Sequence, residues 1–301
     1  MKTCTKRMAL AGAIALSLSL SACSSDSDGA TTSDGAVEAG PTVAKDDALA
    51  AMVPAEIASD GKLLIGTDAS YAPSEFIDAD GTTVVGFDVD LATAVGQVLG
   101  LETEIQNAPF DSLVEGVKTG KYELGVSSFT INPDRIAQVD MPSYFNAGTT
   151  WAAPKGNPEG ITPDNACGRK IAVQKATVQV DDITARSEAC TSAGNEAITI
   201  EQYQLQSDAT AAVVSGKDDA MLADSPVVAY AITQTNDQLE AVGDLYDAAP
   251  YGYAVPKDQG EYTQAIQGAI QKLIDDGTYE QILTNWGVES GAITTSEVNP
   301  T

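Results

Sequence analysis

Beyond residue 60, short apolar segments typical of strands alternate with amphipathic segments typical of helices. The predicted strands cover residues 62–66, 102–106, 122–127, 170–174, 197–200 and 220–223, with apolar residues at helical spacing between most of them. Such alternation is typical of α/β proteins whose parallel sheets bind ligands beyond the carboxyl ends of the strands. Two extended apolar stretches, Thr149–Ala153 and Tyr251–Val255, flank residues 154–248. We therefore predict an α/β fold of two lobes joined by a two-strand hinge.

This interpretation divides the chain into six segments. They are an export signal (1–22), a flexible tether (23–50), the first part of lobe 1 (51–150), lobe 2 (151–249), the return segment of lobe 1 (250–291) and a C-terminal tail (292–301). The return segment carries two predicted helices, at residues 262–275 and 278–286.

The first residues have the pattern of a bacterial export signal. Basic Lys2, Lys6 and Arg7 precede the apolar stretch Met8–Leu20, which as a helix rises about 20 Å, too short to cross a bilayer. The stretch ends in Leu20-Ser21-Ala22-Cys23, which resembles a lipobox and predicts cleavage before a lipidated Cys23. A plain secretory signal followed by a chance cysteine is the alternative. Residues 24–46 have few large apolar side chains, so we expect a flexible tether at the outer face of the cell membrane.

Two cysteines remain in the exported body. Cys4 lies in the predicted signal and Cys23 in the lipobox, which leaves Cys167 and Cys190 in an oxidising compartment. A disulfide between them would stabilise the fold by roughly 3 kcal/mol in the chain-entropy model. Two buried free thiols are the alternative.

Composition restricts the chemistry. The formal net charge is −27 and there is no histidine. The acidity disfavours nucleic acid, and the lack of histidine removes the commonest general base and the usual zinc ligands. Asp78-Ala79-Asp80-Gly81 lacks the further ligands of a calcium loop, so we expect a hairpin turn there. We expect no metal, no cofactor and no catalysis.

The stretch Gly86-Phe87-Asp88-Val89-Asp90-Leu91, followed by Val95-Gly96 and Leu99, resembles the signature of the family 3 solute-binding proteins. The resemblance extends over residues 50–295, and the cysteine pair is similar to that of actinobacterial members. In the signature, we expect Asp88 to cap a helix that packs on the sheet. The resemblance implies a type II periplasmic-binding-protein-like fold that acts as a monomer. It also implies that a free amino acid is bound between closing lobes and delivered to the permease subunits of an ABC importer.

The family pattern places the α-carboxylate of the ligand at Arg135, in a segment that follows a strand and begins a helix. Hydroxyl residues lie close to it in the sequence: Ser127, Ser128 and Thr130. The alternative is a surface arginine paired with Asp134 or Asp140.

For the α-ammonium, the matching residue is Asp224, which ends a predicted strand and could alternatively cap the following helix. Lobe 2 also offers Gln174, Thr177 and Gln179. The family more often has Gly-Thr-Thr-Gln here, so Ala176 and Val178 depart from the pattern. This departure puts the usual backbone approach and one hydroxyl contact in doubt.

Side-chain recognition is assigned to lobe 1. Tyr71 and Phe110 match positions that enclose the ligand side chain in relatives, and Asp68 matches one that meets cationic or amide groups. A basic or polar amino acid is therefore favoured, although Asp68 could instead only order the Tyr71 loop. Ser74 stands where many relatives have phenylalanine, so we expect a smaller, more polar wall. A sensor module or a dehydratase of the same fold is the rival function.

Overall fold

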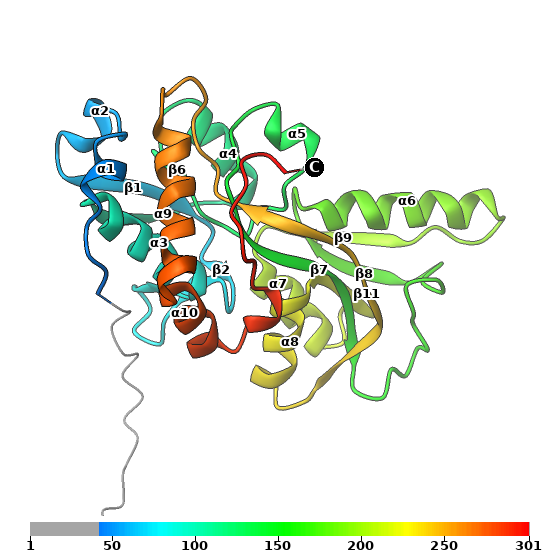
Figure 1. Ribbon diagram of the computed structural model, residues 1–301. Coiled ribbons are helices and arrows are strands. Elements are labelled where there is room, and N and C mark those ends of the chain that lie inside the picture. The colour runs from blue at the N-terminus through cyan, green and yellow to red at the C-terminus, as the bar shows by residue number, and fades with distance from the viewer. Residues whose placement is uncertain (1–41, 301) are drawn as a thin grey trace, which may run out of the picture. The chain divides into compact units, whose positions relative to one another are not determined.

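The computed structural model describes residues 42–300 (Figure 1). The signal at 1–22, the lipobox with Cys23 and the tether up to residue 41 lie outside the described residues. The predicted end of the tether, residue 50, is wrong. Helix α1 (Asp47–Ala50) is capped by Asp46, whose carboxylate accepts the amides of Ala48 and Leu49. Because Val43 and Leu49 pack against the core of lobe 1, the folded part begins before residue 51.

Lobe 1 contains a parallel sheet in the order β5-β1-β6, made of β1 (Lys62–Thr67), β5 (Glu102–Asn107) and β6 (Leu124–Gly125). Helices α3 (Phe87–Leu99), α9 (Tyr262–Asp276) and α10 (Thr278–Trp286) share a core with Leu63 and Ile65 of β1. Leu64 points to the other face, where it packs with residues of α4 (Phe110–Lys118). Burial on both faces explains why β1 is apolar almost throughout.

A small antiparallel sheet joins β2 (Ser70–Tyr71), β3 (Glu75–Ile77) and β4 (Val84–Val85). The turn expected at Asp78–Gly81 links β3 to β4, and there Asp80 accepts the amides of Thr82 and Thr83. The aspartate therefore orders the hairpin turn.

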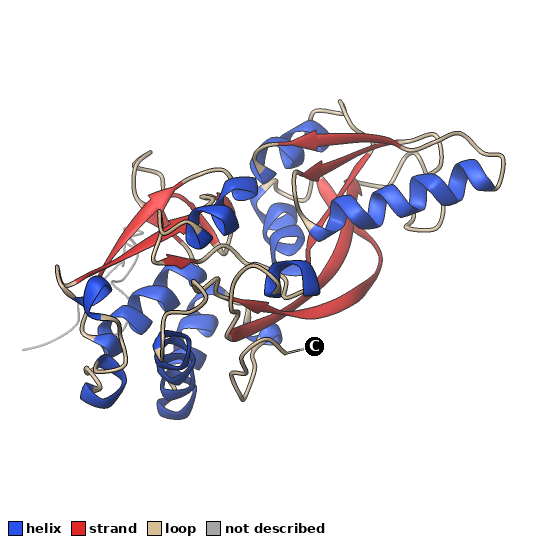
Figure 2. Cartoon of the chain, turned by 90° about the horizontal axis from the view of Figure 1, so that it is seen from above, coloured by secondary structure: helices blue, strands red, loops and turns tan. Residues whose placement is uncertain are grey.

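Lobe 2 contains a five-stranded sheet in the order β11-β7-β10-β8-β9. Its strands are β7 (Ser143–Pro154), β8 (Lys170–Gln174), β9 (Thr199–Tyr203), β10 (Ala220–Asp224) and β11 (Leu239–Gly252). Strands β10, β8 and β9 are parallel as predicted, whereas β7 pairs antiparallel with both β10 and β11. The sheet is therefore mixed. Helix α6 (Val178–Ser192) covers one face and α7 (Gln206–Val214) and α8 (Ser225–Gln234) cover the other (Figures 1 and 2).

The two long strands β7 and β11 connect the lobes. The first predicted crossing strand lies within β7, but the second crossing strand runs earlier than predicted, from Leu239 to Gly252. Residues 254 and 255 already pair with lobe 1, at Gly125 and Asp140. The predicted lobe boundaries at residues 150 and 250 fall inside these two strands.

Short elements complete the described chain: α2 (Ala55–Ala58), α5 (Pro133–Ile136) and the 3-10 helix Glu289–Gly291. The C-terminal tail then lies along the start of β7. Ser296 donates to the Ser143 carbonyl, and Asn299 exchanges backbone and side-chain bonds with Met141. Cys167 and Cys190 form the expected disulfide, with a Cα–Cα distance of 5.6 Å. Over residues 42–300, no helix is both long and apolar enough to span a membrane.

The prediction that Asp88 caps α3 is wrong. Gly86 occupies the N-cap position, no side chain caps the helix, and Asp88 is fully buried. Gly86 has a φ of 139°, and a Cβ atom there would overlap the carbonyl oxygen of Ser74. The glycine of the signature is therefore required by close packing between α3 and the β2–β3 loop.

We predict that Gly86→Ala lowers the free energy of unfolding by roughly 2–4 kcal/mol, because it adds a backbone clash to an unfavourable φ. Gly81→Ala is the matched control, since Gly81 has a φ of 77° but open space around it. Urea unfolding of both variants measures the difference, and equal losses would contradict the packing explanation.

Candidate functional site

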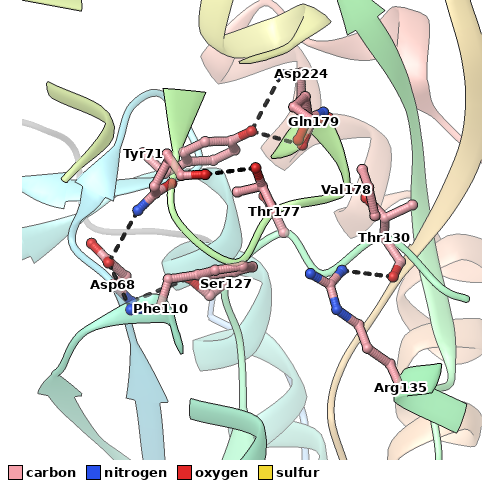
Figure 3. A pocket seen from close by; sticks show the side chains of 12 residues that line it. Asp68, Tyr71, Phe110, Ser127, Thr130, Arg135, Thr177, Val178, Gln179 and Asp224 are labelled. Carbon is pink, nitrogen blue, oxygen red and sulfur yellow. Dashed lines mark hydrogen bonds between the residues drawn. The ribbon is translucent and has the colours of Figure 1, made fainter. Parts of the chain in front are cut away.

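A narrow cavity lies between the lobes (Figure 3). Every residue predicted to contact a ligand lines it, and Val178 is the single addition. The lining residues are Asp68, Tyr71, Phe110, Ser127, Ser128, Thr130, Arg135, Gln174, Thr177, Val178, Gln179 and Asp224. Ser74 was expected to form a wall, but it is fully buried elsewhere and does not line the cavity.

Strand ends place many of these side chains. Asp68 directly follows β1, Ser127 and Ser128 follow β6, Gln174 ends β8 and Asp224 ends β10. Since parallel strands of one sheet end at the same edge, each lobe presents its polar residues at one edge. The cavity forms where these two edges meet.

Arg135 is buried and lines the cavity. Its guanidinium donates to the carbonyls of Thr130 at 2.8 Å and Ala176 at 3.4 Å. Its centre lies 5.4 Å from the ring of Phe110 and 5.6 Å from the ring of Phe129. Burial lowers the pKa of Arg135 to about 10, so the group stays charged at neutral pH. Within residues 42–300 it forms no ion pair, so the alternative of a surface arginine paired with an aspartate is wrong.

The N-terminus of α6 borders the same part of the cavity. Thr177 is the N-cap residue, and its hydroxyl donates to the Gln174 carbonyl instead of capping the helix. The first amides of a helix lack intrahelical acceptors and favour an anion. Ala176 adopts a φ of 62°, the conformation that the family's usual glycine adopts without strain. Val178 contributes an apolar surface where the family more often has a hydroxyl.

Asp224 is buried at the opposite wall, where two side chains donate to it (Figure 3). The Tyr71 hydroxyl lies 2.8 Å from one carboxylate oxygen, and Gln179 Nε2 lies 2.7 Å from the other. Burial raises the pKa of Asp224, while these bonds and the charge of Arg135 oppose the rise. Asp224 occupies the N-cap position of α8 without forming a capping bond, so its carboxylate faces the cavity instead.

Asp68 has two roles in the geometry. Its carboxylate accepts the Ser70 hydroxyl at 2.7 Å and the Phe110 amide at 2.8 Å, so it orders both neighbouring loops. It also accepts Gln174 Nε2 at 3.2 Å, which joins lobe 1 to lobe 2. Burial raises the pKa of Asp68, and the bonds from Ser70 and Phe110 oppose this.

Thr149 was missed by the sequence analysis. This buried residue of β7 accepts Gln179 Nε2 at 3.1 Å and so holds the amide that bonds Asp224. Thr149 lies in a strand predicted only to cross between lobes, and nothing in the local sequence indicates that its hydroxyl reaches α6.

The fold and the cavity define a two-lobed binding protein whose site is completed by residues of both lobes. The model of the bacterial extracellular solute-binding proteins, family 3, matches residues 63–289. The chain belongs to this family and is a family 3 solute-binding protein for amino acids.

The relatives are binding proteins. The arginine-binding protein ArgT of Corynebacterium glutamicum is 39% identical over 250 residues, covering 83% of this chain and 82% of the relative. An ancestral arginine-binding protein, solved with bound arginine, matches with a TM-score of 0.69 and 31% identity, over 75% of this chain and 98% of its own. An ancestral amino acid-binding protein, a precursor of cyclohexadienyl dehydratase, also matches with a TM-score of 0.69 and 31% identity, over 77% of this chain and 97% of its own.

We predict that Arg135→Ala weakens amino-acid binding by at least about 2–3 kcal/mol, because a charge-assisted pair is lost and a carboxylate is left unpaired. Isothermal titration calorimetry measures the change. Arg169→Ala is the matched control, because Arg169 pairs with Glu159 at the surface and does not line the cavity. Near-normal affinity of Arg135→Ala would refute the carboxylate role.

Proposed function

We propose that this chain is the arginine-binding lipoprotein of an ABC importer. The observation that carries the proposal is the set of charges lining the cavity, namely one cation, Arg135, and two anions, Asp68 and Asp224. Arginine carries the complementary set: an α-carboxylate, an α-ammonium and a side-chain guanidinium. A neutral amino acid would leave one buried carboxylate uncompensated, which is unfavourable.

Each charged group of the ligand has an assigned partner. Arg135 and the N-terminus of α6 bind the α-carboxylate, and Asp224 binds the α-ammonium. Asp68 accepts hydrogen bonds from the guanidinium, and Tyr71 and Phe110 enclose the aliphatic stem and the planar head. Ser127, Ser128, Thr130, Gln174, Thr177 and Gln179 supply the remaining polar contacts. The names of relatives that bind arginine support this assignment.

We propose that ligand binding favours the closed state, in which the two lobes are in contact. Tyr71 and Asp68 of lobe 1 bond to Asp224 and Gln174 of lobe 2, so the complete site exists only while the lobes meet. A ligand that bonds to both lobes favours this closed state. The loaded, closed form is then the one that the permease recognises. Cleavage before Cys23, its lipidation and the tether would keep this monomeric receptor at the outer face of the membrane.

The enzyme alternative is disfavoured by the same charges. In the proposed complex each charged side chain is committed to one group of the ligand, so none remains to act on a reacting atom. The sensor alternative uses the same site and differs only in the partner.

We expect a calorimetric screen of the twenty L-amino acids to find the tightest binding for L-arginine, because only a basic ligand balances both aspartates. A thermal-shift series provides an independent measure, since a ligand at 100 times its Kd stabilises the fold by about 2.7 kcal/mol. Failure of L-arginine to bind more tightly than about 100 μM, or tighter binding of glutamine, would refute the assignment.

We expect Asp68→Asn to weaken L-arginine binding by roughly 3 kcal/mol, because the buried guanidinium loses its counter-charge. L-glutamine serves as the internal control, since its side-chain amide is neutral and should lose far less affinity. Equal losses for both ligands would show that Asp68 only orders the neighbouring loops.

A further inference from the structure

Two buried carboxyl groups, Glu75 of β3 and Asp88 of α3, lie behind the cavity without lining it; both residues are 0% exposed. Asp88 Oδ2 accepts three hydrogen bonds, from the Ser128 amide at 2.9 Å, the Ser128 hydroxyl at 3.2 Å and the Tyr144 hydroxyl at 2.7 Å. Glu75 Oε1 accepts one, from the Ser127 hydroxyl at 2.7 Å. The two acids therefore hold the two serines that line the amino-acid site.

Each of the two acids has a second carboxyl oxygen that lacks a hydrogen-bond donor. Glu75 Oε2 and Asp88 Oδ1 are buried, and no residue in the described part of the chain donates a hydrogen bond to either. Glu75 bonds to Ser127 and Asp88 to the adjacent Ser128, so the two carboxyl groups lie close together, and each shifts the pKa of the other. Two ionised carboxylates so placed repel, whereas one proton between them supplies the donor that both oxygens lack.

No lysine or arginine among residues 42–300 forms an ion pair with either acid. Besides each other, the titratable groups that face the pair are carboxyl and phenol groups from neighbouring elements: Asp68, Tyr71, Tyr144 and Tyr253. Burial raises the pKa of Glu75 well above its ordinary value, and the charge of Asp88 raises it further.

We propose that Glu75 and Asp88 share one proton at neutral pH, and that this acid pair positions Ser127 and Ser128 for amino-acid binding. The proton resides on Glu75, because three donors stabilise the charge of Asp88 whereas Glu75 receives only one. Glu75 Oε2–H then donates to Asp88 Oδ1, and every oxygen of the pair is satisfied.

The acid pair controls the site through both serines. Ser128 adopts a φ of 47°, a strained conformation for a residue with a side chain, and Asp88 binds both its amide and its hydroxyl. Ser127 accepts the amide of Asp68 at 3.1 Å while it donates to Glu75. A continuous chain of hydrogen bonds therefore links Glu75 to the backbone of Asp68, the residue assigned to the ligand's guanidinium.

The first test compares wild type with Glu75→Gln in urea unfolding from pH 5 to pH 8, without ligand. A raised folded-state pKa contributes stability that is fully present below the ordinary value of 4.5 and is lost as the pH rises toward the folded-state value. Because glutamine does not titrate, the ratio of the two unfolding constants should change with pH at the expense of wild type, by up to about tenfold per pH unit while the pH is below the folded-state pKa of Glu75. A constant ratio over this range would show that Glu75 is ionised in the folded protein and would overturn the proposal.

The second test measures L-arginine affinity, and only its choice of ligand rests on the proposed function. The side-chain amide of Glu75→Gln would reproduce the pattern of the protonated acid, with an N–H toward Asp88 and a carbonyl toward Ser127. This variant should therefore bind within about threefold of wild type. Glu75→Leu, of similar size, loses both bonds and should bind at least about tenfold more weakly. Equal weakening of both variants would refute the positioning role.

The outcomes separate the two proposals. If wild type does not bind L-arginine, the proposed function fails while the unfolding ratio still decides whether the proton is shared. If Glu75→Leu does not fold, the unfolding ratio and the affinity of Glu75→Gln decide the outcome together.

Discussion

The antiparallel ladder between β7 and β11 holds the two lobes together, and the geometry of the site follows from it. Its register runs from Pro154 paired with Leu239 to Ser143 paired with Gly252, and both strands pass from one lobe to the other. Shifts of register interrupt it between Val242 and Ala249 and again between Tyr251 and Gly252. Each lobe has its own hydrophobic core on its own sheet, and Tyr71 of lobe 1 also packs against the core of lobe 2, so the ladder joins two packed bodies that are in contact. The polar strand ends of the two bodies therefore meet across a cavity that neither core fills.

The cavity holds charges that are costly to bury. Each is stabilised by hydrogen bonds that also set its orientation: Arg135 by two carbonyls, Asp224 by Tyr71 and Gln179, and Asp68 by an amide and a hydroxyl. Two of these bonds cross between the lobes, from Arg135 to Ala176 and from Tyr71 to Asp224. Electrostatics and lobe contact are thus coupled, which is the physical basis for a ligand that favours the closed state.

Much of this was accessible from the sequence, because the relevant signals are local. Apolar periodicity located the main strands and helices, and the polar residues at predicted strand ends do gather in one cavity. The errors arose where tertiary contacts override local pattern. Aspartate commonly caps helices, but Asp88 is buried and accepts hydrogen bonds from Ser128 and Tyr144. The tether ends earlier than predicted because Leu49 packs against the core of lobe 1. Strand β7 pairs antiparallel with β11 because these two strands cross between the lobes in opposite directions.

The family, the α/β class, the disulfide pair and the identity of the residues around the cavity all follow from the sequence, since motifs and strand ends encode them locally. Which side chains bond to each other is set by the tertiary fold. The bonds of Thr149 with Gln179 and of Asp68 with Gln174, and the proximity of Glu75 to Asp88, join different elements. The bond between Asp68 and Gln174 also joins the two lobes. The partner of a buried polar atom depends on three-dimensional packing, and no local periodicity encodes it.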